Sequence, residues 1–283
     1  MTSIRKKISE FQKILLNLAN FKTNVMKYLK FCFIALLVSC NSFVNTPPQM
    51  PGTYLMVSQT VNNGTKNMNY TDLKQLKIYT DNYMMYTQLN PNDSISGFGV
   101  GTYTSDTGGV KENTIYRASG TTADTTAPAY SLKITKTSEG YNQVIPDILI
   151  DSQKSTLTEV YQKIGNTTKS PLDGVWKETE SYTVKGNDTS RNDRIQYKAF
   201  YNGYFMYGQT IKNGSSYQTG MGFGTFVAIG DNKIKETDLN SSFPVNAGHS
   251  FEIGYELNGT DNYKQTINYP DSSKSVEVYE RLK

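Results

Sequence analysis

Paired carboxylates are the residues of this sequence best suited to acid–base chemistry. Glu112 and Glu159 in the first half of the chain recur as Glu236 and Glu277 in the second half. Two carboxylates can cleave a glycosidic bond, one as the acid and the other as the base or nucleophile. Repeated polar positions in a duplicated β-structure are more typical of a solvated face. We therefore predict a protein that is not an enzyme, with a glycoside-directed enzyme as a minor alternative.

Histidine and cysteine offer little further chemistry. The single histidine, His249, aligns with Tyr130 of the first half. A lone histidine makes a poor metal or haem site, and no nucleophile-elbow motif accompanies it for a Ser-His-Asp arrangement. Both cysteines, Cys32 and Cys40, lie in the N-terminal segment. The sequence predicts no metal and no cofactor.

Tyrosine-rich hairpins are candidates for ligand contact. Tyr83 and Tyr86 in the first half match Tyr204 and Tyr207 in the second half. Aromatic rings of this kind can form a surface for an apolar or sugar-like ligand. Alternating aromatic residues on strands also fill protein cores, and this is the alternative interpretation of the four tyrosines.

The charge distribution narrows the class of partner. The chain has 283 residues, is 37% hydrophobic and 19% charged, and carries a formal net charge of +4, as expected for one or two globular domains. Residues 1–40 contain seven basic side chains and one acidic side chain, which leaves 22 basic and 24 acidic side chains in the remainder. The basic excess is confined to the N-terminal segment, so we predict no nucleic-acid partner.

The N-terminal segment has the pattern of a signal peptide. Residues 31–38 are apolar, follow Lys27 and Lys30, and are too few to span a bilayer as a helix. We predict a signal peptide over residues 1–39. Met26 is a second plausible start, in which case residues 1–25 are an upstream extension.

Residues 37–40, LVSC, resemble the lipobox of bacterial lipoproteins. The resemblance implies that Cys40 becomes the first mature residue and carries lipid, including palmitate, so that the protein is held at a membrane. Asn41 follows, where an aspartate often signals inner-membrane retention, and the resemblance therefore points to the outer membrane of the cell envelope. Residues 40–50 are then a lipidated tether.

The chain after residue 50 is an internal duplication. Three pairs of blocks match in the same order at nearly constant spacing: GTY (52–54) with GVW (174–176), GFGVGTY (97–103) with GMGFGTF (220–226), and EVYQKI (159–164) with EVYERL (277–282). We predict a first domain over residues 51–165, a polar linker at 166–170 and a second domain over 171–283.

Each copy is predicted to be all-β. Runs rich in Tyr, Val, Ile, Thr and Phe alternate with turn signals, of which Asn202-Gly203 is the clearest because it suits a type I′ hairpin turn. No amphipathic helix interrupts them. The pattern favours a small antiparallel barrel of about eight strands in each copy.

The repeated glycine stretch fits this barrel. Gly97, Gly99 and Gly101 share one face of a strand, and their missing side chains permit sharp coiling or close packing by an aromatic ring. A nucleotide-binding loop would need G-x-G-x-x-G spacing and a following helix, and the stretch has neither.

The Gly-x-Trp at residues 174–176, together with a closing strand that carries Arg281, resembles the lipocalin superfamily, and the paired frames resemble lipocalin-like domains of bacterial lipoproteins. The resemblance implies two tandem lipocalin-like antiparallel β-barrels. It also implies that Trp176 packs against Arg281 where the barrel closes. Tyr54 and Lys163 are expected to make the equivalent, weaker contact in the first copy.

Three functional classes remain open. The leading prediction is a non-enzymatic cell-envelope lipoprotein that binds a small apolar or sugar-like ligand in its barrels. The alternative is an envelope scaffold or protein-interaction module with filled barrels, and the minor alternative is the enzyme. An internal cavity would favour binding, and convergent carboxylates in a cleft would favour catalysis.

Overall fold

The computed structural model describes residues 46–126, 129–150 and 152–283. The predicted signal peptide, the upstream extension and the lipid-attachment residue Cys40 lie outside the described residues. Pro47–Lys283 form one compact unit. No helix in the described part of the chain is long and apolar enough to cross a membrane.

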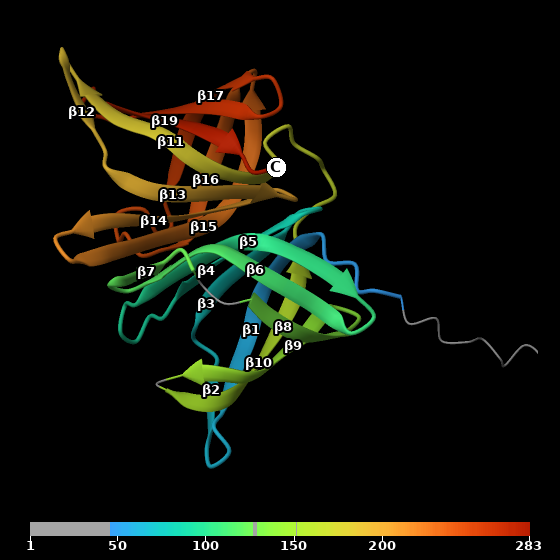
Figure 1. Ribbon diagram of the computed structural model, residues 1–283. Coiled ribbons are helices and arrows are strands. Elements are labelled where there is room, and N and C mark those ends of the chain that lie inside the picture. Colours follow the sequence, from blue (N-terminus) through green and yellow to red (C-terminus); the bar gives the residue numbers. More distant parts are fainter. Residues whose placement is uncertain (1–45, 127–128, 151) are drawn as a thin grey trace, which may run out of the picture. The chain divides into compact units, whose positions relative to one another are not determined.

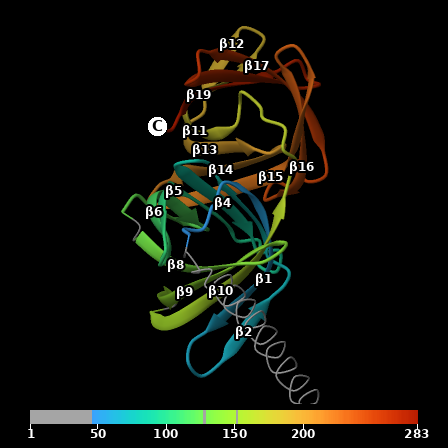
Figure 2. The same cartoon turned by 90° about the vertical axis from the view of Figure 1, so that its right-hand side faces the viewer.

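The first copy of the repeat is a closed antiparallel barrel of eight strands (Figures 1 and 2). Each strand pairs with its neighbour in chain order, and β10 returns to pair with β1 and closes the barrel. The short strands β2 (Asn67–Tyr70) and β7 (Thr122–Asp124) pair with β1 and β6 outside this circuit. The barrel strands are β1 (Gly52–Asn62), β3 (Lys74–Tyr79), β4 (Tyr83–Leu89), β5 (Ser96–Asp106), β6 (Gly109–Ser119), β8 (Ala129–Lys136), β9 (Gly140–Ile150) and β10 (Gln153–Ile164).

The second copy repeats this topology. Strand β19 pairs with β11 and closes the barrel, and the short strand β12 (Asp188–Arg191) pairs with the end of β11 as β2 pairs with the end of β1. The barrel strands are β11 (Gly174–Lys185), β13 (Arg194–Tyr201), β14 (Tyr204–Asn213), β15 (Ser216–Gly230), β16 (Lys233–Ser241), β17 (Ser250–Asn258), β18 (Asn262–Asn268) and β19 (Lys274–Arg281). The predicted fold class, two tandem antiparallel barrels of eight strands, is confirmed. That each copy folds when isolated stays a prediction.

The predicted hairpin turn and the predicted packing of aromatic rings on the glycine stretches are both present in the structure. Asn202 and Gly203 both adopt positive φ, 55° and 80°, as a type I′ turn requires. The ring of Tyr86 packs where a side chain on Gly99 would lie, and Tyr207 packs in the same way on Gly222. The glycine stretches therefore admit an aromatic ring into each barrel, as the sequence predicted.

Three clusters of buried hydrophobic side chains stabilise the unit. Two lie within the individual barrels. The third joins the outer faces of the barrels, where Phe98 and Tyr116 of the first barrel lie against Tyr197 of the second. Phe98 also packs directly on Gly208, a contact that leaves no room for a Cβ atom. The outer faces that meet here are consequently apolar rather than solvated.

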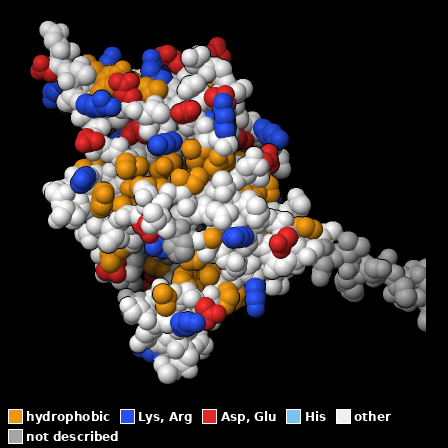
Figure 3. Space-filling model, viewed as in Figure 1, with side chains coloured by type: hydrophobic (Ala, Val, Ile, Leu, Met, Phe, Trp, Pro, Cys, Tyr) orange, Lys and Arg blue, Asp and Glu red, His pale blue; other side chains and the backbone are white. Residues whose placement is uncertain are grey.

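The surface carries no dominant charge on the face drawn in Figure 3. Lys and Arg side chains are interspersed there with Asp and Glu, and hydrophobic side chains lie between them. This mixture agrees with the near-balanced charge of the sequence after residue 40.

Candidate functional site

A buried ion pair lies inside each barrel at equivalent positions. Lys77 Nζ is 2.7 Å from Glu112 Oε1 in the first barrel, and Lys198 Nζ is 2.6 Å from Glu236 Oε1 in the second. All four side chains are buried. The interpretation of the repeated glutamates as a solvated face is therefore wrong. They point into the barrel because the outer face of the neighbouring strands is used for apolar packing between the barrels.

A second repeated feature surrounds the other glutamate pair. Gln143 Nε2 and Tyr161 Oη donate to Glu159 at 2.7 and 2.9 Å. In the second barrel the equivalent Gln265 and Tyr279 donate to Glu277 at 2.6 and 2.5 Å. Lys77 and Lys198 also donate to these glutamines, so one hydrogen-bonded network runs through each barrel interior.

The second barrel has an additional ion-pair group with no counterpart among the described residues of the first barrel. Arg194 Nη2 lies 2.7 Å from Glu178 and 2.7 Å from Glu277. Strand register places Met56 and Leu73 of the first barrel at the positions of Glu178 and Arg194. The interior of the second barrel is therefore more polar than that of the first.

This difference shifts the pKa values of the equivalent Glu159 and Glu277 in opposite directions. Burial raises the pKa of Glu159 above its ordinary value, and the Lys77 charge offsets only part of this effect. Burial acts on Glu277 in the same direction, but the charges of Arg194 and Lys198 and the hydrogen bonds from Tyr279 and Arg194 outweigh it and lower the pKa. Glu277 is consequently held as a carboxylate.

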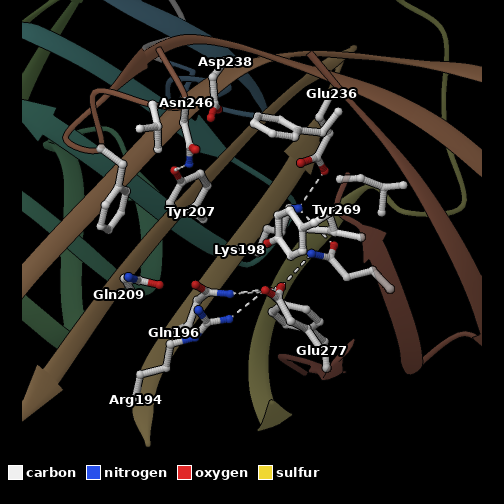
Figure 4. A pocket seen from close by; sticks show the side chains of 17 residues that line it. Arg194, Gln196, Lys198, Tyr207, Gln209, Glu236, Asp238, Asn246, Tyr269 and Glu277 are labelled. Carbon is white, nitrogen blue, oxygen red and sulfur yellow. Dashed lines mark hydrogen bonds and ion pairs between the residues drawn. The ribbon is translucent and has the colours of Figure 1, made fainter. Parts of the chain in front are cut away.

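The polar interior of the second barrel contains a cavity of about 250 Å³ (Figure 4). Figure 4 shows Asp238 and Asn246 at one end of the group of side chains, Arg194 at the other, and Lys198 between them. Val245, which is 79% exposed, marks the mouth. Aromatic walls come from Tyr207, Phe243, Phe251, Tyr269 and Tyr279.

Asp238 is the unusual group in this cavity. Its side chain lies two residues after Glu236 on the same face of β16, is 3% exposed, and lines the cavity. Its Oδ1 atom has no hydrogen-bond partner among the described residues. Burial, followed by the charge of Glu236, raises the pKa of Asp238 from 3.8 to about 7, with Lys198 acting in the opposite direction. When ionised, this acceptor is free to take a hydrogen bond from a bound molecule.

The four predicted tyrosines do not form one surface. Tyr86 and Tyr207 point into the barrels, and Tyr207 lines the cavity. Tyr83 and Tyr204 pack against the apolar cluster between the barrels. A spacing of three residues along a strand places the two members of each pair on opposite faces. Of the four, Tyr207 is the one at the cavity, where its hydroxyl lies 3.2 Å from Ser241 and accepts a hydrogen bond from Asn246 at 3.3 Å.

The proposed closing residues meet at the ends of the first and last barrel strands. The Arg281 Cζ atom lies 4.0 Å from the centroid of the Trp176 ring, and Trp176 and Arg281 are paired across β11 and β19. Lys163 Nζ lies 5.9 Å from the Tyr54 ring in the first barrel. The guanidinium also donates to the backbone carbonyls of Thr260 and Pro171, at 2.7 and 2.9 Å. This contact lies away from the cavity and is structural.

The alignment of His249 with Tyr130 is wrong. Glu112 pairs with Tyr130 across β6 and β8, and the equivalent Glu236 pairs with Phe251 across β16 and β17. The equivalent of Tyr130 is therefore Phe251, because the loop before β17 shifts the spacing by two residues. His249 is exposed, and its backbone carbonyl accepts the amide of Asp238.

Lys198, Asp238 and Arg194 were not identified from the sequence. The repeated Gln-x-Lys at residues 75–77 and 196–198 was a usable signal for the lysine, since both copies carry it on the strand before the tyrosine hairpin. Asp238 and Arg194 had no such signal, because the first copy has Thr114 and Leu73 at their positions.

No family model and no curated protein matches the sequence. Among solved structures, similarity is found to a tryptophan-to-alanine mutant of the vaccine antigen Transferrin Binding Protein B from Haemophilus parasuis Hp5. The identity is 9%, the TM-score is 0.24, and the match covers 84% of this chain and 77% of that chain. A double mutant of the same protein matches at 9% identity and a TM-score of 0.22, with 83% and 76% coverage. The function is therefore inferred from the geometry of the site.

Proposed function

We propose that the protein is a bacterial cell-envelope lipoprotein, anchored through Cys40 to the outer membrane, that binds a small ligand in the cavity of the second barrel without transforming it. The observation that carries this proposal is the cavity itself, which combines aromatic walls with a buried, unpartnered acceptor on Asp238. Cavities that hold drug-sized ligands measure about 300–1,000 Å³. A volume of about 250 Å³ suits a smaller molecule.

The charges of the site support binding rather than catalysis. A two-carboxylate glycosidase needs a second available carboxylate as base or nucleophile. Glu236 is paired with Lys198, and Glu277 is paired with Arg194. Among the described residues, no second carboxylate beside Asp238 is therefore available to act as base or nucleophile. A glycoside-directed enzyme is the weakest of the three proposed functions.

The first barrel favours a scaffold role for that half of the protein. Its interior holds the ion pair within a cluster of hydrophobic side chains, and Val61 and Leu157 are buried where the second barrel has Thr183 and Ser275. The outer face of the first barrel packs against the second barrel. We propose that the first barrel supports the second rather than binding the ligand.

Ligand-observed fluorine NMR with benzene-sized fluorinated fragments tests the binding proposal. Fragments should bind the full chain in detergent, and Gln209→Trp should abolish their binding because Gln209 is buried in the cavity wall. Gln88→Trp, at the equivalent position of the first barrel, is the matched control and should leave binding unchanged. Binding that survives Gln209→Trp, or a full chain that binds no fragment, contradicts the proposal.

The lipid anchor has its own test. Cys40→Ser should remove labelling by a palmitate analogue and move the protein from the membrane fraction to the soluble fraction of the cell envelope. Cys32→Ser is the matched control and should remain labelled and membrane-bound. A Cys40→Ser protein that retains label and stays in the membrane fraction would overturn the anchoring site without touching the ligand proposal.

A further inference from the structure

We infer that the ligand of the second barrel is a small organic cation, whose ammonium group is bound by the Asp238 carboxylate and whose apolar part packs against the aromatic walls. This inference rests on the proposed binding function and deepens it by naming the chemical class of the ligand. The evidence is the charge balance of the cavity, the state of Asp238 and the arrangement of the rings.

The interior of the second barrel has more carboxylates than cations to pair with them. Arg194 pairs with both Glu178 and Glu277, and Lys198 pairs with Glu236. The two basic side chains therefore face three carboxylates before Asp238 is counted. Asp238 forms no ion pair within the described residues, so its carboxylate, when ionised, is a negative charge that a bound cation would neutralise.

Asp238 is positioned to receive such a cation. Its backbone is held on both sides, since its amide donates to the His249 carbonyl at 3.0 Å and its carbonyl accepts the Gly248 amide at 2.8 Å. The side chain is buried at the cavity wall with Oδ1 unpartnered. An ammonium group supplies both the missing hydrogen-bond donor and the missing positive charge.

Aromatic rings line the same cavity as the Asp238 carboxylate. Tyr207 and Phe243 are stacked with their centroids 6.5 Å apart and their planes 19° apart, and both line the cavity with Phe251. Ring faces attract organic cations through their quadrupoles, most strongly where water is excluded. The rings thus favour the same ligand charge as Asp238 and provide a surface for its hydrocarbon part.

A metal ion is a poorer match for the site. No group of three or more His, Cys, Asp or Glu side chains in the described ranges is arranged to hold a metal. Hard metal cations also require several oxygen ligands, whereas Glu236 and Glu277 are already engaged by Lys198 and Arg194. An organic cation needs one carboxylate and a ring face, which the cavity offers.

Three probes of nearly equal size and different charge test the inference: benzylammonium, benzyl alcohol and benzoate. Their binding to the full chain in detergent is measured by NMR titration at pH 8, where Asp238 is charged. Benzylammonium should bind about tenfold or more tightly than benzyl alcohol, because a hydrogen bond to a charged partner contributes about 1.5–3 kcal/mol. Benzoate should bind most weakly.

The variant Asp238→Asn keeps the shape of the side chain and removes its charge. It should bring the affinities for benzylammonium and benzyl alcohol to within about threefold of each other. Glu256→Gln, which removes one negative charge from the exposed part of β17, is the control and should leave the preference intact.

The outcomes separate the two proposals. Equal affinity of the wild-type chain for benzylammonium and benzyl alcohol, tighter binding of benzoate, or an undiminished cation preference in Asp238→Asn would overturn the cation inference and leave ligand binding standing. A wild-type chain that binds none of the three probes, and none of the fluorinated fragments, would overturn both. The selectivity of the wild-type chain is decisive even if Asp238→Asn fails to fold.

Discussion

The two barrels differ most at inward-facing positions around the same buried ion pair. Four such positions are apolar in the first barrel and polar in the second: Met56 and Glu178, Val61 and Thr183, Leu73 and Arg194, and Leu157 and Ser275. Hydrophobic side chains surround the polar network of the first barrel, whereas the network of the second barrel carries additional charges and lines a cavity.

This contrast shows which part of a duplicated barrel is free to change. Removing one partner of a buried ion pair leaves an uncompensated charge, which is strongly destabilising. The Lys–Glu pair is accordingly present in both copies. The surrounding positions can exchange apolar for polar groups when the new charges are paired, as Arg194 is with Glu178 and Glu277.

The largest expected effect is on the ion pair itself. Lys77→Met should lower the free energy of unfolding by about 3–5 kcal/mol, because Glu112 is left buried without its ion-pair partner. Lys198→Met should cost less, about 1–3 kcal/mol, since Glu236 lines the cavity, where water can solvate its charge once Lys198 is removed. Urea denaturation at pH 7 measures both. Equal losses would mean that the cavity does not relieve the buried charge, and that the two interiors differ less than their side chains indicate.

The next effect is the pH dependence that Asp238 contributes in the second barrel. The charged and titratable groups that face Asp238 are Glu236, Lys198 and Tyr207. The pKa of Asp238 is about 7 in the folded protein, whereas its ordinary value is 3.8. Between about pH 4 and pH 7 the folded state therefore keeps a proton that the unfolded state has already lost. Stability contributed by this group is therefore full below about pH 4 and falls as pH rises, by about 2–4 kcal/mol in all.

Asp238→Asn should remove this contribution. The variant is expected to gain stability relative to the wild-type chain as pH rises from 4 to 8, in denaturation curves measured at each pH. Thr114→Val, at the equivalent position of the first barrel, has no titrating group to remove and is the control. A stability difference between Asp238→Asn and wild type that does not change with pH would show that Asp238 titrates normally.

The smallest expected effect concerns the closing contacts. Arg281→Ala should destabilise the protein by about 1–2 kcal/mol, since it removes a stacked guanidinium, whereas Lys163→Ala should cost about 0.5 kcal/mol because an ammonium is a hydrated point charge. Thermal unfolding of the two variants side by side provides the measurement. A loss for Lys163→Ala that matches or exceeds that for Arg281→Ala would contradict the ranking.

Much of the fold could be predicted because its signals are local. Asn202-Gly203 specifies a tight turn through its two positive φ angles, and the matching blocks indicate two modules. The pairing of Trp176 with Arg281 followed from the resemblance to lipocalins and from their places at the two ends of one module. The cavity was not predictable in this way, because Asp238 and Arg194 have no counterpart of the same type in the other copy.

What the sequence determined by itself is the duplication, the strand character and the turns, since each depends on residues close together in the chain or on a repeat within it. Only the tertiary structure decided which face of each strand is inside. In β3, Gln75 and Lys77 point into the barrel while Leu76 and Ile78 join the cluster between the barrels, and β13 repeats this with Lys198 and Ala199. Strand alternation separates polar from apolar faces and by itself predicts that only the apolar face is buried. Here both are buried, because a second barrel covers the apolar face and ion pairs satisfy the polar one.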